Sequence, residues 1–357
     1  MAVIDQYFKY LVEAGGSDLH LSEGQPPKVR VNGTISAISD ENLEGQAFKN
    51  LLAEICDPQA FQKYLEEGDL DFAYEMDETS RFRCNYFKQQ HGLGAVFRLI
   101  PTKIATLEEL GVPTVVKEFA HMRSGLVLVT GVMGSGKTTL LAAILRHIIE
   151  KGGRNVATYE SPIEFDLLSI PNQGGPVSQS TIPEHLQSFI RAVRNSTRTA
   201  PNVVLIGESR DAETLRGMIE SVETGVAAYS TVHTRSVPET LSRIINVFPV
   251  EERLQVTVTL LSSLRLVVNQ RLVPMLGGKG RVALREFLAF TPEIREVLLD
   301  TPPERLIQTC ETLLIKYGQR MQDAAQAAYD AGKITKENTQ AIMAERKTSQ
   351  PITKEEQ

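Results

Sequence analysis

A stretch of eight residues, 131–138, restricts the fold of this chain more than any other part of its sequence. It reads GVMGSGKT and fits the pattern G-x-x-x-x-G-K-[ST], a loop whose backbone N–H groups surround phosphate groups. An apolar run precedes it, and the segment that follows carries leucine and isoleucine at helical spacing. These flanks predict a buried parallel strand before the loop and a helix after it. Strand, glycine loop and helix N-terminus therefore occur in the order that a nucleotide site in an α/β fold requires.

The residues of this loop have separate expected tasks. Lys137 is expected to reach the β- and γ-phosphates of ATP, and the hydroxyl of Thr138 to ligate Mg²⁺. Glycine lets the backbone approach the phosphates closely, and the next helix presents its positive dipole end. The alternative without function is a glycine turn that binds no ligand. The other expected nucleotide-binding positions are Gly131, Gly134, Ser135, Gly136 and Thr139.

The composition narrows the class of protein. At 357 residues the chain is long enough for about two domains. Its net charge of −6 disfavours bulk attraction to nucleic acid, so no direct nucleic-acid contact is expected. No apolar run is long enough to span a membrane, and the N-terminal MAVIDQYFKY lacks the pattern of a signal peptide. The scattered Cys56, Cys84 and Cys310 fit a reducing cytosol and give no metal-site pattern.

The chain is expected to divide into four parts. Residues 1–100 alternate polar and apolar positions in several runs, and residues 44–67 have a helical pattern, which together predict a small α+β domain. Residues 101–113 are the expected linker and hinge, including a short helix near Leu107 and Leu110. From 114 to 345, strand and helix patterns alternate as in an α/β domain, and the last of these residues are helical. The polar segment 346–357 is expected to be a flexible tail.

Four apolar runs in the α/β part are each followed by a candidate binding segment or catalytic residue. The first run ends in the phosphate loop, and the next three end at Glu160, Glu208 and His233. In open α/β sheets, ligands bind beyond the carboxyl ends of the strands. We therefore expect these side chains to surround one phosphate tail together with Lys137 and Thr138.

The polar residues at these strand ends suggest particular roles. Glu208 is the candidate for positioning or deprotonating the attacking water, because it is the single acid at the end of a Walker B-like strand. Glu160 is the candidate for holding a metal-bound water, with Glu164 as a second acid beyond it. His233 could donate to the γ-phosphate and report its loss. The alternatives are a solvated strand-end glutamate, two surface acids in a turn, and a structural histidine.

The chain resembles the PilT-like branch of the type II/IV secretion ATPases over nearly its whole length. The phosphate loop, TYESPIEF, VVLIGESRDAET and TGVAAYSTVHT resemble, in order, the Walker A, Asp box, Walker B and His box of that family. SDLHLSEGQPPKVRVNG resembles the opening of its PAS-like N-terminal domain, and RFRCNYFKQQHGLGAVFRLIP its arginine-bearing hairpin. TPEIREVL and GQRMQDAAQAAYDAGKIT resemble its C-terminal helices.

Two departures bear on the choice of branch. The Asp box usually reads E-D-P-I-E, and Ser161 stands here at the aspartate position. Pilus retraction motors usually carry A-I-R in the C-terminal motif, and here Glu293 replaces the alanine. The Ser161 variant, RDAET and LRLVVNQRLVP look more like the DotB/TraJ-type ATPases of type IVB secretion and conjugation systems.

The resemblance implies both a fold and a function. It implies a RecA-like P-loop NTPase core with a smaller N-terminal PAS-like α+β domain, Mg²⁺-dependent ATP hydrolysis and a homohexameric ring. Nucleotide would lie between the two domains, and Arg81, Arg83 and Arg98 would be candidates to reach its phosphates, from the same chain or a neighbour.

The expected place of work is the cytoplasmic face of the inner membrane, with secretion or pilus machinery as the partner. The expected function is to drive type IVB secretion or conjugative transfer. A pilus retraction motor, a nucleic-acid translocase and a non-motor adaptor remain as alternatives.

Overall fold

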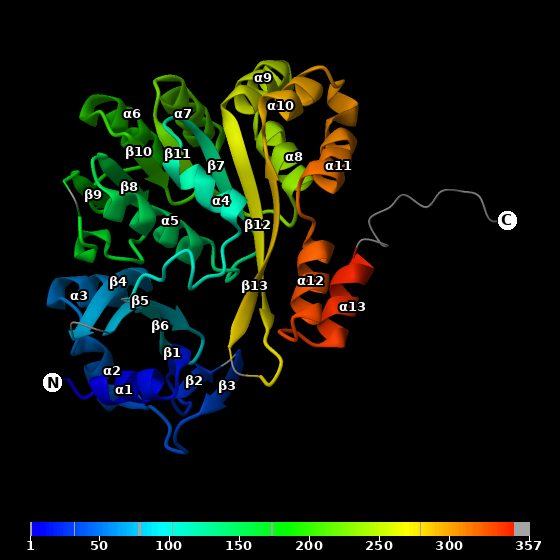
Figure 1. The fold of residues 1–357 in the computed structure, drawn as a ribbon. Coiled ribbons are helices and arrows are strands. Elements are labelled where there is room, and N and C mark those ends of the chain that lie inside the picture. The colour runs from blue at the N-terminus through cyan, green and yellow to red at the C-terminus, as the bar shows by residue number, and fades with distance from the viewer. Residues whose placement is uncertain are drawn as a thin grey trace. The chain divides into compact units, whose positions relative to one another are not determined.

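The computed structural model of the protein describes residues 2–31, 33–77, 80–101, 103–172, 174–278 and 280–345. The predicted tail, 346–357, lies outside the described residues. The chain forms two compact units, Met1–Lys103 and Ile104–Gln357, here called the N-terminal and C-terminal units (Figure 1). Within the described part, no helix has the length and apolar character needed to cross a membrane.

The N-terminal unit is a six-stranded antiparallel sheet with helices packed on one face. The strand order is β3-β2-β1-β6-β5-β4. Its elements are α1 (Asp5–Glu13), β1 (Gly16–Ser22), β2 (Lys28–Val31), β3 (Thr34–Ala37), α2 (Gly45–Ala53), α3 (Pro58–Glu67), β4 (Asp69–Asp77), β5 (Ser80–Gln89) and β6 (Gly92–Pro101).

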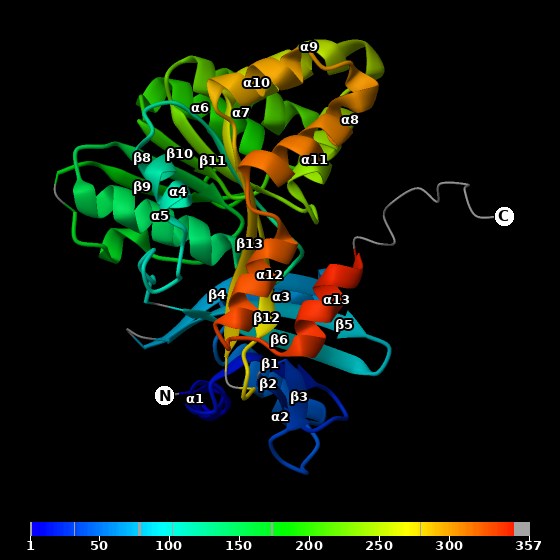
Figure 2. The same ribbon diagram turned by 45° about the vertical axis from the view of Figure 1, so that its right-hand side comes forward.

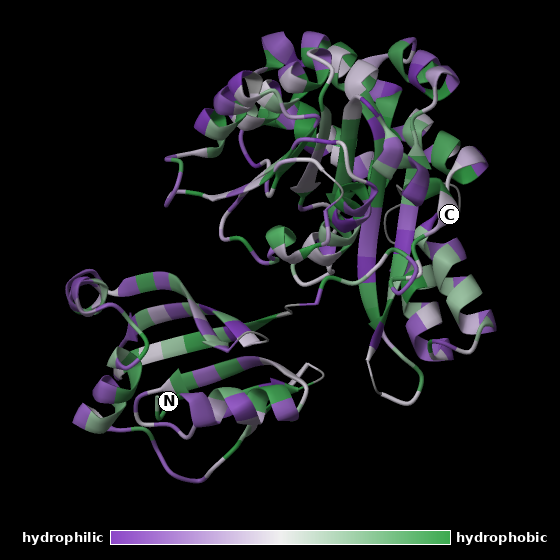
Figure 3. Cartoon of the chain, turned by 60° about the vertical axis from the view of Figure 1, so that its left-hand side comes forward, coloured by the Kyte–Doolittle hydropathy of each residue, from purple (hydrophilic) through white to green (hydrophobic). Residues whose placement is uncertain are grey.

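The alternation of β5 sorts its side chains between the two faces of this sheet. Phe82, Cys84 and Tyr86 are fully buried against the helices, whereas Arg81 and Arg83 lie on the opposite, partly exposed face. This is the arrangement predicted from the period-two pattern. Figure 3 shows the same alternation as bands of green and purple along the strands of this unit.

The C-terminal unit is built on a seven-stranded sheet in the order β13-β12-β7-β11-β10-β8-β9. Every pair in it is parallel except β12 with β13. Its strands are β7 (Gly125–Thr130), β8 (Val156–Glu160), β9 (Val177–Thr181), β10 (Val203–Ile206), β11 (Ala227–Val232), β12 (Leu264–Pro274) and β13 (Arg281–Ala289). Its α-helices are α4 (Thr114–Glu118), α5 (Lys137–Lys151), α6 (Phe189–Thr199), α7 (Ala212–Glu223), α8 (Val237–Val247), α9 (Arg253–Ser263), α10 (Pro292–Leu299), α11 (Leu306–Tyr317), α12 (Met321–Asp330) and α13 (Lys336–Glu345), with short 3-10 turns η1 (Phe119–His121), η2 (Leu167–Ser169), η3 (Val250–Glu252) and η4 (Pro303–Arg305).

Helices cover both faces of this sheet, which explains why β7 is apolar throughout. Leu126 and Leu128 pack into a core shared with α6 to α11. Val127 and Val129 point the other way, into a core shared with α4, α5 and the chain before them. A strand buried on both faces reads as a continuous apolar run, as the sequence predicted here.

The long antiparallel pair β12 and β13 was not predicted. Figures 1 and 2 both show α12 and α13 beside the outer half of this pair. Val273, Leu284, Met321 and Ala325 share a small separate core there. The last helices therefore extend the C-terminal unit around β12 and β13 rather than covering the centre of the sheet.

One helix prediction was confirmed and one was wrong. The helical pattern over 44–67 corresponds to two helices, α2, which ends at Ala53, and α3, which begins at Pro58 after its N-cap Asp57. The Asp57 carboxylate accepts hydrogen bonds from the first backbone N–H groups of α3, and proline suits the first helical turn. The short helix expected near Leu107 is a turn. The side chains of Leu107, Ile104 and Val112 are buried in the core beneath α5. The segment expected to be a linker is therefore partly packed against the C-terminal unit.

Candidate active site

The phosphate loop joins β7 to α5 and requires glycine at two positions. Gly131 has φ +143°, and a Cβ there would lie 2.4 Å from the backbone oxygen of Gln270. Gly136 is the N-cap of α5 with φ +81°, and a Cβ there would lie 3.0 Å from Gln270 Nε2. The neighbouring strand β12 thus lies against the loop at both glycines. The close backbone oxygen excludes a side chain at Gly131, and the positive φ disfavours one at Gly136.

Lys137 is folded back onto its own loop. Its Nζ donates to the backbone oxygens of Gly131 and Val132, each at 3.0 Å, and lies 3.5 Å from His233 Nδ1. Its side chain is buried. Burial lowers the pKa of this ammonium from its usual value, while the negative charges of Glu208 and Glu164 oppose that shift. The ammonium is therefore held by neutral carbonyl oxygens, which a negatively charged phosphate could replace.

The hydroxyl groups of the loop lie at the start of α5. Ser135 Oγ is buried and has no hydrogen-bond partner within the described chain, which is unusual for a buried hydroxyl. Thr138 and Thr139 occupy the first turn of α5 and are half-buried. A group with several acceptor oxygens, such as a phosphate, fits these donors and the positive end of the helix.

Neighbouring strands bring the predicted residues to the same edge of the sheet. In sheet order, β7 leads to Lys137, β11 to His233, β10 to Glu208 and β8 to Glu160. These strands are parallel, so all of their carboxyl ends lie on one side. The sheet order therefore brings to one edge the strand ends that the sequence was expected to bring together.

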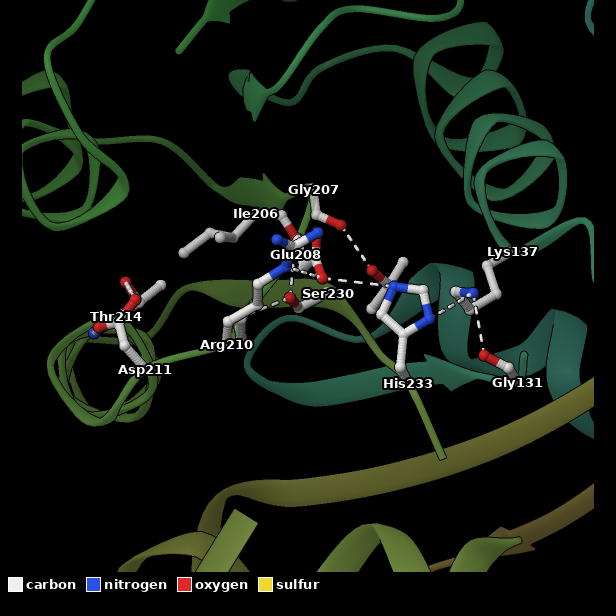
Figure 4. A network of polar contacts seen from close by, with 12 residues as sticks. Gly131, Lys137, Ile206, Gly207, Glu208, Arg210, Asp211, Thr214, Ser230 and His233 are labelled. Carbon is white, nitrogen blue, oxygen red and sulfur yellow. Dashed lines mark hydrogen bonds and ion pairs between the residues drawn. The ribbon is translucent and has the colours of Figure 1, made fainter. Parts of the chain in front are cut away.

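His233 connects the phosphate loop with the acid at the end of β10. Its Nδ1 faces Lys137, and its Nε2 lies 3.3 Å from Glu208 Oε1 (Figure 4). Burial lowers the pKa of this imidazole, and the positive charge of Lys137 lowers it further, while Glu208 opposes both effects. His233 thus has the position and the two ring nitrogens needed to relay a change between the two groups.

The backbone around Glu208 is fixed by hydroxyl groups from β11. Thr231 Oγ1 donates to the Gly207 oxygen at 2.6 Å, and the hydroxyls of Ser209 and Ser230 lie 2.8 Å apart. The Glu208 side chain is 22% exposed and pairs with Arg210, which is itself mostly exposed. A firmly held backbone with a partly exposed carboxylate can present that carboxylate to a water molecule.

Glu160 is the most deeply buried acid of the site. Its Oε1 accepts hydrogen bonds from Thr158 Oγ1 at 2.7 Å and from Gln179 Nε2 at 3.3 Å. Burial raises its pKa to about 7, even though these donors pull in the opposite direction. Glu164 lies nearby, partly buried, and its negative charge also raises the pKa of Glu160. A bound cation would relieve the cost of ionising this pair.

The three predicted arginines lie in the N-terminal unit, on the face opposite its helices. Arg83 and Arg98 are directly paired across β5 and β6. Arg98 Nε donates to the Asp18 carboxylate at 2.9 Å, and Arg30 also pairs with that carboxylate. Arg98 is exposed but already engaged within its own unit, and Arg81 and Arg83 are partly exposed.

The sequence reasoning missed a set of polar residues on β12 and β13. Asn269 Nδ2 donates to Thr130 Oγ1 at 2.9 Å and to the Thr234 oxygen at 3.0 Å, so it joins the strand before the phosphate loop to the segment after His233. Gln270 contacts the loop itself. The available signal was the polar pair Asn269-Gln270 inside the apolar run LRLVVNQRLVP, because buried amides need specific partners.

Comparison with known proteins places this geometry in a family. The family model described as type II/IV secretion system protein matches residues 2–355. The type IV pilus retraction ATPase PilT of Pseudomonas aeruginosa is 38% identical over 309 residues, covering 87% of this chain and 89% of that protein.

Two crystal structures resemble the chain over almost its whole length. The Legionella pneumophila ATPase DotB has a TM-score of 0.88 with 35% identity, covering 96% of this chain and 95% of that one. The pilus retraction motor PilT with bound ADP has a TM-score of 0.84 with 32% identity, covering 96% and 97%. These likenesses confirm the predicted fold class, a RecA-like core with a smaller N-terminal α+β domain.

Proposed function

The chain belongs to the type II/IV secretion system protein family and is an ATPase, and we propose that it works as a hexameric motor in type IVB secretion or conjugative transfer. The observation that carries the chemical part is the continuous contact from the phosphate loop through Lys137 and His233 to Glu208. It joins Lys137, an ammonium that could bind phosphate, to Glu208, a carboxylate that could orient water. Both lie at the carboxyl ends of parallel strands. The proposed reaction is attack of water on the γ-phosphorus of ATP, giving ADP and phosphate.

Binding would begin with an exchange of partners at Lys137. The phosphates would take the place of the Gly131 and Val132 oxygens, and the free hydroxyl of Ser135 would gain an acceptor. The backbone N–H groups at the start of α5 would add the fixed dipoles of a helix N-terminus. Glu208 would then orient the attacking water and accept its proton.

The donor set fits Mg²⁺ as a nucleotide-bound ion. Within the described residues, no cluster of three or more histidine, cysteine or acidic side chains forms a metal cage. Mg²⁺ in nucleotide sites takes most of its ligands from phosphate oxygens and water and needs few from the protein. Thr138 would supply its hydroxyl, and Glu160 would hold a coordinated water. When bound, the ion offsets charge that develops on the phosphate oxygens.

Loss of the γ-phosphate would be reported through His233. Its two ring nitrogens face Lys137 and Glu208, so a change on either side alters the other. We propose that Arg81 and Arg83 reach the nucleotide phosphates from the N-terminal unit of the same chain or a neighbour, since a guanidinium fork suits phosphate. Because Arg98 is paired with Asp18, it would have to leave that ion pair to take part.

Assembly into a ring would let ATP hydrolysis at this site drive movement. Six copies that complete one another's sites could convert hydrolysis into relative movement of the two units, with the motor docked on membrane machinery at the cytoplasmic face of the inner membrane. The test is the ATPase rate per chain as a function of protein concentration, followed together with mass by analytical ultracentrifugation. The proposal predicts that rate and hexamer fraction rise together, and a fully active monomer would contradict it.

Type IVB secretion or conjugation is favoured by the Ser161 variant of the Asp box and by the structural likeness to DotB. A pilus retraction motor is the second candidate, because PilT is 38% identical. Deleting the gene in its source organism separates the two. Loss of conjugative transfer or effector delivery with intact twitching supports secretion, whereas loss of twitching alone supports retraction.

A nucleic-acid translocase is the alternative from another class. The net charge of −6 weighs against it, because such proteins draw most of their affinity from phosphate contacts. Stimulation of the ATPase by DNA, with salt-sensitive binding, would support the translocase and oppose the secretion motor.

A further inference from the structure

Gln270 holds the phosphate loop from the neighbouring strand. Its side-chain Nε2 donates to the Ser135 backbone oxygen at 2.7 Å, and the residue is buried. Its backbone oxygen also leaves no room for a Cβ at Gly131, and its amide nitrogen would be in tight contact with a Cβ at Gly136. Gln270 therefore lies against the glycine loop both at its start, Gly131, and near its end, at Ser135 and Gly136.

Arg285 on β13 fixes the orientation of the Gln270 amide. Arg285 Nε donates to Gln270 Oε1 at 2.8 Å, so the acceptor end of the amide faces Arg285 and its donor end faces the loop. The other guanidinium nitrogens donate to the backbone oxygens of Gly111 at 3.1 Å and Leu110 at 3.0 Å. Burial lowers the pKa of Arg285 to about 10. Within the described residues, the acceptors of these three bonds are an amide oxygen and two backbone oxygens, none of which is charged.

The carbonyls that Arg285 contacts belong to the segment 104–112, the first residues of the C-terminal unit. Ile104, Leu107 and Val112 anchor this segment in the core beneath α5. Arg146, on α5 itself, donates to the Ile104 oxygen. The segment is thus tied to the helix that follows the phosphate loop and, through β13 and β12, to the loop.

We propose that Gln270 and Arg285 are positioning residues that hold the phosphate loop and couple its conformation to the segment 104–112. If nucleotide binding moves the Ser135 carbonyl, the Gln270 amide must follow or lose its acceptor. Arg285 then adjusts its hydrogen bonds to the segment where the chain enters the C-terminal unit. The inference rests on the nucleotide site proposed above.

The sharpest variant is Gln270→Glu. A carboxylate still accepts from Arg285 but cannot donate to the Ser135 oxygen, and it places two acceptors against each other. We expect ATP affinity to fall at least about tenfold, the loss expected when a buried hydrogen bond is replaced by an unmatched pair. Lys137→Ala, measured in parallel, tests the nucleotide site itself. If Lys137→Ala abolishes binding and Gln270→Glu leaves it within twofold of wild type, the inference is overturned and the site stands.

A double-mutant cycle tests whether Arg285 acts through Gln270. The set is Gln270→Met, Arg285→Met and the double variant, with ATP affinity as the readout. Arg271→Met is the matched control, because Arg271 lies on the same strand as Gln270 and pairs instead with Glu345 on α13. We expect the double variant to bind ATP as Gln270→Met does. Losses that multiply would show independent actions and contradict the proposed path.

Hydrogen exchange separates positioning from simple structural support. In the wild type, ATP should slow amide exchange across 104–112, where the N–H groups of Leu110, Gly111 and Val112 are hydrogen-bonded within the turn. Gln270→Glu and Arg285→Met should remove this response, and Arg271→Met should keep it. Arg285→Lys, which retains the charge without the fork, covers the case in which Arg285→Met fails to fold. A response retained in folded Gln270→Glu with saturating ATP would overturn the coupling.

Discussion

Replacement of Glu160 by glutamine should make the folded chain more stable above neutral pH while impairing ATP hydrolysis. Glu160 is 6% exposed, and burial raises its pKa from 4.5 to about 7. A raised pKa means that the folded state holds the proton more tightly than the unfolded chain does. The stabilising contribution is fully present below about pH 4.5, the unfolded value, and is lost as the pH rises through about 7.

The size of the effect follows from the separation of the two pKa values. About 2.5 pH units at 1.36 kcal/mol per unit gives roughly 3 kcal/mol of stability that the wild type loses between pH 4.5 and pH 8. Glutamine keeps the acceptor for Thr158 and Gln179 but brings an amide donor that needs its own partner. The net gain of Glu160→Gln at pH 8 should therefore be about 2 kcal/mol.

The measurement is urea unfolding of wild type and Glu160→Gln from pH 5 to pH 9. Far-ultraviolet circular dichroism is the suitable probe, because the chain contains no tryptophan. Glu184→Gln, at an exposed position, is the matched control and should keep the pH dependence of the wild type. Parallel curves for wild type and Glu160→Gln over the whole range would refute the assignment of a buried, proton-holding carboxylate.

Three further substitutions test separate parts of the structure. Gly131→Ala should abolish nucleotide binding measured by calorimetry, because its Cβ would lie 2.4 Å from the Gln270 backbone oxygen; unchanged affinity would contradict this close packing. Lys137→Ala should weaken ATP binding at least about tenfold, as expected for loss of a charged phosphate contact, whereas wild-type affinity would remove Lys137 from the site. Asp18→Asn should lower the stability of the N-terminal unit at pH 7. Burial alone would raise the pKa of Asp18, but hydrogen bonds and the charge of Arg98 hold it below the usual value. The difference from wild type should therefore shrink as acid protonates the carboxylate, and a pH-independent difference would argue against the ion pair.

The central strands were predictable because both of their faces are buried. An apolar run followed by a glycine loop or an acid is a strong local signal, and β7, β8, β10 and β11 all carry it. Parallel strands end on the same edge, so Glu160, Glu208 and His233 could be assigned to one site before the fold was known.

The strands at the two sides of the sheet, β9, β12 and β13, were not predictable from the sequence. β9 is a short, partly exposed edge strand, VSQST, and its composition does not distinguish it from a loop. β12 and β13 pair with each other and with β7 through contacts far apart in sequence. Gln270 and Arg285 became visible as parts of the site only when that pairing placed them against the phosphate loop, because neither belongs to a local motif.

The arginine hairpin shows a different limit. Its alternation correctly placed Arg81 and Arg83 opposite the core, because period-two patterning fixes the face of a strand. The pairing of Arg98 with Asp18 depends on β1 lying beside β6, which no local pattern announces. Side-chain pairs between strands that are far apart in sequence can be identified only once the fold is known.

The most direct test of the central claim is single-turnover ATP hydrolysis by Glu208→Gln, with ATP affinity measured on the same preparation. Glutamine preserves the shape of Glu208 but cannot accept the proton of the attacking water. The account predicts wild-type ATP affinity within about threefold and a hydrolysis rate lowered at least about 100-fold, in the range for loss of a general base. Hydrolysis near the wild-type rate would contradict the assignment of Glu208 as the residue that activates water.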